Sequence, residues 1–492
     1  MMNLKKIVAM AVVGCSVFVL SSCGDDPGVT TTDNSSQTDV PVTTTESIGS
    51  TDFETELKNY NGYDFTILSA GNVAYDDFSY DEASSVALDN AMYQRQQKVE
   101  SDYHVNIDSI VQKAYSVGNG PGYQKISQAV LGGDCFYDAA LVAGYDVSVL
   151  AYNDMLYDMN SISTLHLEKA WWDQQANREL AINDLMFFTT GDITNQDNDS
   201  VFTLVFNKKL FEDYQLEDPY ALVKENKWTL ENFGKLTKAV GQDLNHDDKR
   251  DENDLFGLLV WDDAIMGIIN ASGEKCATVQ ENGEIVLSLY NERTVSLLEQ
   301  YFDIIFDENS AFCYQRHIKT GADMWNNNQA LFWMTAMANI PAMRTMEADF
   351  GILPYPKMTA EQDSYHNTIS PYNSQFYCVP LIQNDVEMTG TILEALAYYG
   401  YTIVKPAYYD KTLVGQSTRD DESSEMLDII FSTLSFDFGY YYQVGSFNSQ
   451  LIFMVREYDR NFTSRYNTYK TEAETKLDTI NTFFKQVISK WN

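Results

Sequence analysis

Carboxylate side chains recur at fixed spacing in one short stretch of this chain, DLNHDDKRDEND at residues 243–254. A twelve-residue calcium-binding loop takes oxygen ligands from positions 1, 3, 5, 7, 9 and 12, and position 7 supplies only a backbone carbonyl. Those positions fall on Asp243, Asn245, Asp247, Lys249, Asp251 and Asp254. The spacing therefore predicts a structural calcium (Ca2+) site.

Two residues depart from the EF-hand form of such a loop. Position 6 is Asp248, where glycine usually allows the sharp turn, and position 12 is Asp254, one methylene shorter than glutamate. The alternative interpretation is a solvated acidic loop without metal. If calcium binds, we expect modest affinity and a role in stability, remote from any ligand site.

Sequence motifs for several kinds of catalysis are absent. The chain has five histidines without an HExxH pair, and it lacks GxSxG and GxxxxGK[ST]. The paired carboxylates of a glycoside hydrolase are defined by their separation in space, which the sequence does not give. A surface-anchored glycoside hydrolase therefore remains an alternative.

The N-terminus predicts export and lipid attachment. Lys5 and Lys6 precede an apolar run at residues 7–20, which is short for a membrane span and typical of a signal-peptide core. The following Leu-Ser-Ser-Cys resembles a bacterial lipobox, which implies cleavage before Cys23 and a lipid on that cysteine. Residues 1–22 are thus the predicted lipoprotein signal peptide. The alternative is an ordinary signal peptide with an incidental cysteine.

Residues 23–57 are rich in Ser, Thr and Asp and poor in large apolar side chains, which predicts a flexible tether. Together with the lipid, this places the protein on the extracellular face of the cell membrane, anchored without spanning it. Four cysteines are expected in the folded part, and the sequence leaves open whether they pair or stay as free thiols: Cys135, Cys276, Cys313 and Cys378.

Composition favours a large globular protein with a strongly negative charge. Apolar residues make up 44% of the chain and aromatics 13%. Residues 58–492 are too many for one simple core, which predicts two lobes. The 71 acidic and 33 basic residues give a formal net charge of −38. Such a negative field disfavours nucleic acid as a partner.

Alternation of buried strands with amphipathic helices predicts an α/β fold with a mostly parallel sheet. We expect helices at 86–100, 123–131, 230–240 and 472–491, and strands at 63–68, 105–110, 137–143, 201–206, 256–260, 350–353 and 376–381. Ligands of such sheets bind beyond the carboxyl ends of the strands. That rule places loops at 69–71 and 144–146 on one rim.

Three segments, 133–162, 201–240 and 324–358, carry a resemblance to a known family. They resemble the extracellular solute-binding proteins of bacterial ABC importers, family 1 type, the class that includes maltose-binding protein. The resemblance covers nearly all of the chain after the tether. It implies a two-lobed periplasmic-binding-protein-like fold (type II), with a ligand cleft between lobes joined by a multi-strand hinge. Lobe one would comprise 58–200 plus 376–408, and lobe two 201–375 plus 409–492.

The same resemblance implies a binding protein without enzymatic activity, expected to be a monomer. It would capture a small solute by lobe closure and deliver it to an ABC transporter permease. The 32 Tyr, 26 Phe and 7 Trp favour a carbohydrate, because aromatic faces pack on sugar C–H surfaces. A ligand sensor or an adhesin with the same fold is the alternative.

Candidate ligand-binding residues follow from the family pattern, position by position. They are Tyr145, Asp146, Asp199, Ser200, Trp261, Asp262, Trp333, Tyr372 and Ser374. For the aromatic members, packing in the core is the alternative. The Trp171–Trp172 pair is interpreted as part of a surface loop.

Overall fold

A computed structural model describes most of the chain, namely residues 50–80, 84–115, 117–134, 136–318, 320–383, 385–414 and 421–491. The predicted signal peptide, Cys23, most of the tether and Cys135 lie outside these residues. Within them, no helix has both the length and the apolar character needed to cross a membrane. Three described cysteines are buried free thiols: Cys276, Cys313 and Cys378.

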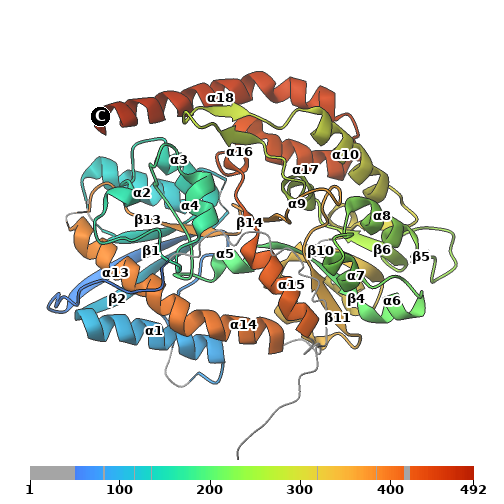
Figure 1. Ribbon diagram of the computed structural model, residues 1–492, viewed down its shortest axis with the longest axis horizontal. Helices are drawn as coiled ribbons and strands as arrows, with labels where there is room; N and C mark the ends of the chain where they lie inside the picture. The colour runs from blue at the N-terminus through green and yellow to red at the C-terminus, as the bar shows by residue number, and fades with distance from the viewer. Residues whose placement is uncertain are drawn as a thin grey trace, which may run out of the picture. The chain divides into compact units, whose positions relative to one another are not determined.

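A four-stranded sheet forms the first half of the fold, in the order β13-β3-β1-β2. Its strands are β1 (Tyr63–Gly71), β2 (Val105–Lys113), β3 (Ala139–Ala143) and β13 (Gln375–Cys378). β1 runs parallel to β2 and β3, and β13 is antiparallel to β3. The expected loop at 69–71 is wrong, because those residues continue β1 and pair with β2. Figure 1 shows this sheet beneath α2 and α3.

A six-stranded sheet forms the second half, in the order β11-β4-β10-β6-β5 with β9 beside β6. Its strands are β4 (Phe202–Asn207), β5 (Gly241–Gln242), β6 (Leu255–Val260), β9 (Ala311–Cys313), β10 (Ala330–Ala336) and β11 (Phe350–Leu353). The sequence analysis missed β10, whose seven residues are all buried. A fully buried strand and a buried helical segment both appear in sequence as a continuous apolar run, so the sequence pattern does not distinguish them.

Helices cover both sheets, and the α/β class is confirmed. The expectation of a mostly parallel sheet is wrong for the second sheet, where β4 is antiparallel to β10 and β11, β5 is antiparallel to β6, and only β9 and β10 run parallel to β6. In the first half they are α1 (Ala87–Tyr103), α2 (Pro121–Gly132), α3 (Gly144–Ala151), α4 (Gln174–Leu180) and α5 (Gln196–Asp199). They continue with α6 (Lys208–Asp213), α7 (Pro219–Lys224), α8 (Leu230–Lys238), α9 (Ala264–Ala271), α10 (Glu292–Ile305), α11 (Tyr314–His317) and α12 (Ala322–Asn326). The last are α13 (Val386–Tyr399), α14 (Lys405–Val414), α15 (Asp421–Ser432), α16 (Phe438–Tyr441), α17 (Phe447–Glu457) and α18 (Phe462–Trp491).

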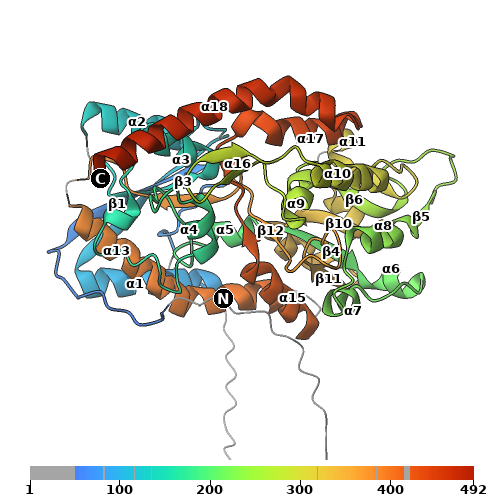
Figure 2. The same ribbon diagram turned by 45° about the horizontal axis from the view of Figure 1, so that its top comes forward.

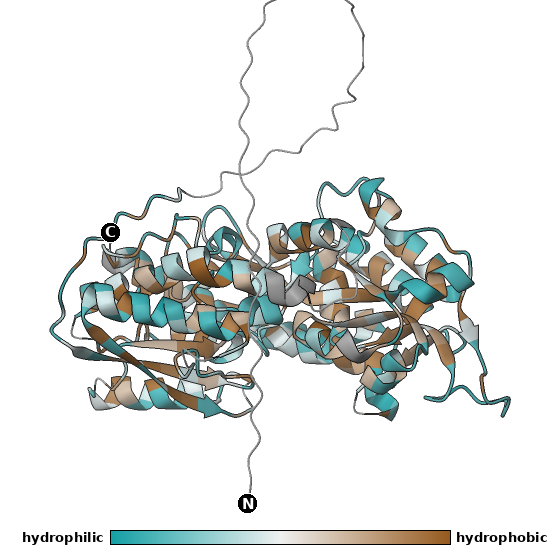
Figure 3. Cartoon of the chain, turned by 90° about the horizontal axis from the view of Figure 1, so that it is seen from below, coloured by the Kyte–Doolittle hydropathy of each residue, from teal (hydrophilic) through white to brown (hydrophobic). Residues whose placement is uncertain are grey.

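Short strands complete the described secondary structure: β7 (Ala277–Val279) pairs with β8 (Ile285–Leu287), and β12 (Asn367–Thr368) with β14 (Leu434–Ser435). In Figure 3 the sheet strands carry most of the hydrophobic colour, and the helices are mixed or hydrophilic. This is the pattern of strands buried between covering helices.

The chain passes between the two sheets through paired segments. Val201 forms a β-bridge with Ile369, and the Ser370 N–H donates to the Ser200 carbonyl at 3.1 Å. β4 begins directly after the first of these segments and β13 shortly after the second. The lobe boundaries given above remain a prediction.

The last helix, α18, contacts both halves of the fold. Its Phe484 ring lies 5.9 Å from the ring of Phe187 in the first half, and its Tyr466 ring stacks on Tyr290 of the second half with centroids 4.7 Å apart. Figures 1 and 2 show α18 extending from the side of α10 to the side of α2. The helix begins earlier than expected, at Phe462.

The surface-loop interpretation of Trp171 and Trp172 is wrong. Both indoles are buried, and each N–H donates to the carboxylate of Glu394 on α13, at 3.0 and 2.8 Å. Burial raises the pKa of Glu394 to about 7, although these hydrogen bonds oppose the shift. These two hydrogen bonds therefore hold α13, which lies far away in sequence, against the first half of the fold.

Replacing Glu394 tests this contact. Glu394→Leu leaves two buried indole N–H groups without an acceptor, so we expect a loss of roughly 2–5 kcal/mol in the free energy of unfolding. Glu394→Gln keeps one carbonyl acceptor and should lose less. Urea unfolding curves measure both values, and equal midpoints for the two variants and the original chain would contradict the assignment.

Candidate functional site

Side chains from both halves of the fold meet around the start of α9. We call this group the Asp263 cluster: Tyr145, Asp263, Tyr372, Tyr440 and Asn448. Tyr145 follows β3 of the first sheet, and Asp263 follows β6 of the second. The carboxyl ends of these two strands are where the rule for open α/β sheets places ligands.

Hydrogen bonds and ring contacts join the members of the cluster. The amide Nδ2 of Asn448 donates to the Tyr145 hydroxyl at 2.9 Å, and the Tyr145 and Tyr440 rings meet edge to face at 6.1 Å. Burial and then the charge of Asp263 raise the pKa of the Tyr145 phenol. Asp263 acts in the same direction on Tyr372 and Tyr440, after burial and a neighbouring tyrosine. One carboxylate thus lies within electrostatic range of three phenols.

Asp263 is the least satisfied member of the cluster. Its side chain does not cap α9, and its carboxylate has no hydrogen-bond partner among the described residues. Burial and the adjacent charge of Asp262 raise its pKa to about 7, against the opposing effect of Arg456. A carboxyl group held in this state is available to a ligand.

Aromatic faces lie next to the cluster. The Tyr372 ring is 5.4 Å from the ring of Tyr115, which is 69% exposed. Trp261 packs on Phe202 with ring centroids 4.5 Å apart. Tyr372 and Tyr115 can offer apolar ring surface to a ligand without a change in the core.

Of the predicted ligand-binding residues, the structure brings Tyr145 and Tyr372 into the cluster and Trp261 next to it. Position 145 is not in a loop, as expected, but in the first turn of α3. Asp262 is fully buried and forms an ion pair with Arg456 of α17. The free carboxylate is that of the next residue, Asp263.

The other predicted residues bond within the fold. The Asp146 carboxylate accepts the Gly120 and Tyr123 N–H groups at the start of α2, at 2.9 and 3.4 Å. The Ser200 and Ser374 hydroxyls donate to backbone carbonyls four residues earlier. Asp199 accepts the Tyr408 hydroxyl at 2.9 Å. Ligand contact by these four residues stays a prediction.

Trp333 lies in the middle of β10 and is 3% exposed. Its ring is 5.9 Å from that of Trp325 and 6.4 Å from that of Tyr314. It belongs to the aromatic core on one face of the second sheet, which was the stated alternative. Contact with a ligand stays a prediction here too.

Sequence reasoning missed Asp263, Tyr440 and Asn448. The Trp-Asp-Asp triplet at 261–263 was the available signal, but only burial and the ion pair with Arg456 distinguish its two carboxylates. Tyr440 and Asn448 come from α16 and α17, where nothing in the local sequence separates a ligand contact from a core residue.

The acidic loop at 243–254 bonds mainly to itself. Asp243, Asn245, Asp247 and Asp251 each accept backbone N–H groups of the loop. The two Asp254 oxygens accept the N–H groups of residues 244 and 251 at 3.0 and 3.1 Å. Arg250 lies 3.5 Å from the same carboxylate, which already offsets its charge.

Metal ligation by this loop is not visible in the side-chain arrangement. In the described part of the chain, no three His, Cys, Asp or Glu side chains converge as metal ligands. Position 6 does make the required turn, because Asp248 adopts a left-handed backbone with φ of 62°. Calcium binding through Asp243, Asn245, Asp247, Lys249, Asp251 and Asp254 stays a proposal.

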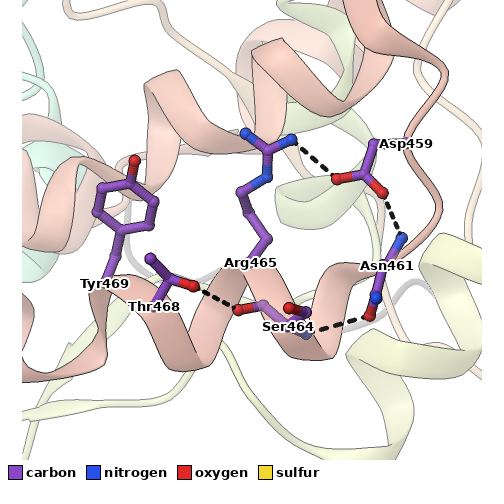
Figure 4. A pocket seen from close by; sticks show the side chains of 6 residues that line it. All are labelled: Asp459, Asn461, Ser464, Arg465, Thr468 and Tyr469. Atoms are coloured by element: carbon purple, nitrogen blue, oxygen red, sulfur yellow. Dashed lines mark hydrogen bonds and ion pairs between the residues drawn. The ribbon is translucent and has the colours of Figure 1, made fainter.

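Two surface hollows lie away from the cluster. One, of about 280 Å³, is between α17 and α18, and Figure 4 shows its polar groups bonding to one another, with Arg465 paired to Asp459. The other, of about 340 Å³, is lined by Glu252, Asn253, Ile318, Thr320, Asp323, Met324, Asn327 and Gln329. Neither contains a residue of the Asp263 cluster.

Solved structures share this fold. The galacto-N-biose-/lacto-N-biose I-binding protein of a Bifidobacterium longum ABC transporter, in complex with lacto-N-biose, matches 86% of this chain and 99% of its own, with a TM-score of 0.56 and 9% identity. A Listeria monocytogenes ABC substrate-binding protein in complex with cycloalternan matches 86% and 99%, with a TM-score of 0.51 and 13% identity.

A family 1 extracellular solute-binding protein from Alicyclobacillus acidocaldarius matches 87% of this chain and 100% of its own, with a TM-score of 0.52 and 11% identity. At such identities the likeness establishes the fold alone. The chain therefore has the two-lobed α/β fold of ABC solute-binding proteins, as predicted. No family model and no curated protein matches its sequence.

Asparagine at position 263 should stabilise the protein above neutral pH. The folded state raises the Asp263 pKa to about 7 from an ordinary value near 4, so stability falls as pH rises between these values. Asp263→Asn removes that loss, and its gain in melting temperature should be larger at pH 8 than at pH 4. Asp478→Asn, at an exposed position of α18, is the matched control. A pH-independent difference would contradict the assignment.

Chelation tests the acidic loop. If calcium binds, EDTA should lower the melting temperature by several degrees, because the ion stabilises only the folded state. Asp247→Ala should melt lower and respond to neither EDTA nor calcium. An unaltered melting temperature of the original chain on adding EDTA, and then on adding excess calcium, would rule out a stabilising calcium site.

Proposed function

We propose that this chain is a non-enzymatic solute-binding protein of an ABC importer. It captures a carbohydrate between its lobes, closes on it, and presents it to the permease. Export by residues 1–22, lipid attachment at Cys23 and a tether over 23–57 would keep the protein at the extracellular face of the membrane. The shared fold and the composition of the Asp263 cluster support this proposal.

The observation that carries the proposal is the origin of the cluster's side chains. Tyr145 comes from the first half of the fold, Asp263 from the second, and Tyr372 from the segment that passes between them. A ligand touching all three stabilises one relative position of the halves. Such a ligand binds the closed arrangement more tightly than the open one and so shifts the population toward it.

A sugar suits the chemistry of this group. Phenol and amide groups, with one carboxylate, match sugar hydroxyls, and the Tyr372 and Tyr115 rings match C–H surfaces. The solved relatives named above contain lacto-N-biose and cycloalternan. A third, from Thermotoga lettingae, contains tagatose, with a TM-score of 0.50.

Binding is favoured over hydrolysis by the state of the two adjacent carboxylates. A glycoside hydrolase needs two carboxyl groups on opposite sides of the scissile bond. Asp262 is held by Arg456 and directly precedes Asp263 in the chain, so the two do not form such a pair. A sensor or adhesin would use the same site and differ only in the protein partner.

A thermal-shift screen of residues 58–492 with mono- and oligosaccharides tests the function. Binding to the native state should raise the melting temperature by several degrees for one class of sugar. An unchanged melting temperature with every sugar would overturn the carbohydrate proposal and would not affect the assignment of the fold.

For a sugar that binds, Tyr372→Ala and Tyr115→Ala should each weaken affinity roughly tenfold, because each removes an aromatic face. Both side chains are partly exposed, so the melting temperature of the free protein should change little. Phe136→Ala, at a 61% exposed aromatic outside the cluster, is the matched control. Calorimetric titration that gives unchanged affinity in both tyrosine variants would place the sugar elsewhere.

A further inference from the structure

The Asp263 cluster and the residues beside it contain more carboxyl groups than cations. Two carboxylates and one guanidinium act on one another there: Asp262, Asp263 and Arg456. Arg456 donates its Nε–H to Asp262 in an ion pair. The phenols of the cluster are neutral, because burial raises their pKa values above the ordinary value. Asp262 and Asp263 thus share one nearby guanidinium, and an ionised Asp263 has no cation of its own among the described residues.

The Asp263 cluster also contains hydrogen-bond acceptors that have no donor among the described residues. Asn448 is 4% exposed, its Nδ2 is committed to Tyr145, and its Oδ1 is buried without a hydrogen-bond partner. The Asp263 carboxylate also accepts no hydrogen bond from the described residues. Buried polar atoms are nearly always paired in native proteins, so the unpaired Asn448 Oδ1 calls for a ligand that donates, and the half-buried Asp263 carboxylate is open to the same kind of ligand.

The aromatic surroundings favour the same kind of ligand. Tyr145, Tyr372 and Tyr440 all lie within electrostatic range of Asp263. The negative face of an aromatic ring attracts a cation, most strongly where water is excluded. The formal net charge of −38 adds a long-range field that attracts cations and repels anions.

We propose that the cluster selects an amino sugar, a carbohydrate with a free and protonated amino group, over its neutral counterpart. The ammonium group pairs with Asp263, and a neighbouring N–H or O–H of the sugar donates to Asn448 Oδ1. Acidic sugars are rejected by the uncompensated carboxylate. This inference rests on the proposed carbohydrate-binding function and names the class of sugar.

Matched sugars test the selection directly. Calorimetric titrations at neutral pH compare D-glucosamine with D-glucose, D-galactosamine with D-galactose, and glucosamine oligomers with cello-oligosaccharides of equal length. In at least one pair, the aminated member should bind tenfold or more tightly, as a charge-assisted contact provides. High salt should reduce this ratio, because it screens the ion pair.

The Asp263→Asn variant identifies the residue responsible. It should bind both members of the preferred pair with affinities within about twofold of each other, whereas Asp478→Asn keeps the original ratio. Equal or tighter binding of the neutral sugar in every pair, or a preference that persists in Asp263→Asn, overturns the inference and leaves the proposed function intact. Absence of binding by all of these sugars and by the wider screen overturns both.

Discussion

Backbone hydrogen bonds hold together the two segments in which the chain crosses between the sheets, on top of a hydrophobic core that both halves share. Ser370 N–H donates to the Ser200 carbonyl, and the Gly144 N–H donates to the Ser374 carbonyl at 3.2 Å. The close approach requires glycine, because a Cβ at position 144 would lie 2.9 Å from backbone atoms of Pro371. Tyr145 and Tyr372 each adjoin this junction, so the same bonds position two residues of the candidate site.

The candidate site also contains one carboxyl group, that of Asp263, whose ionisation is unfavourable in the folded state. Asp263 is held near two fixed neighbours, Asp262 and Arg456, and burial shifts its pKa upward. Ionising such a group destabilises the folded state, and nothing else in the described fold uses its carboxylate. Proteins commonly retain a destabilising group of this kind where a ligand compensates for it. The structural cost and the proposed binding role both follow from the same burial.

Much of the fold is predictable from sequence, because buried strands read as apolar runs bounded by turn residues. The runs at 63–68 and 350–353 lie within strands β1 and β11, and the run at 201–206 overlaps β4. The failures have physical causes. The sequence of β10 lacks the alternation of apolar and polar residues that marks a half-buried strand. The indole of Trp172 donates to the carboxylate of Glu394, which is 222 residues away in sequence.

The site was predictable only in part. The rule for strand ends pointed to Tyr145 and the family resemblance to Tyr372, and both lie in the Asp263 cluster, while their contact with a ligand stays a prediction. Asp263 was missed by one position, since long-range partners decide which of two adjacent carboxylates is neutralised. Asn448 enters from a helix near the C-terminus, and its role depends on a hydrogen bond to a residue 303 positions away.

The most direct test of this account is a crystal structure of residues 58–492 with the tightest-binding sugar from the screen. We predict that the sugar contacts Tyr145 and Tyr372 on one side and Asp263 on the other. A sugar bound in the hollow between α17 and α18, or one that contacts only one half of the fold, would contradict the account.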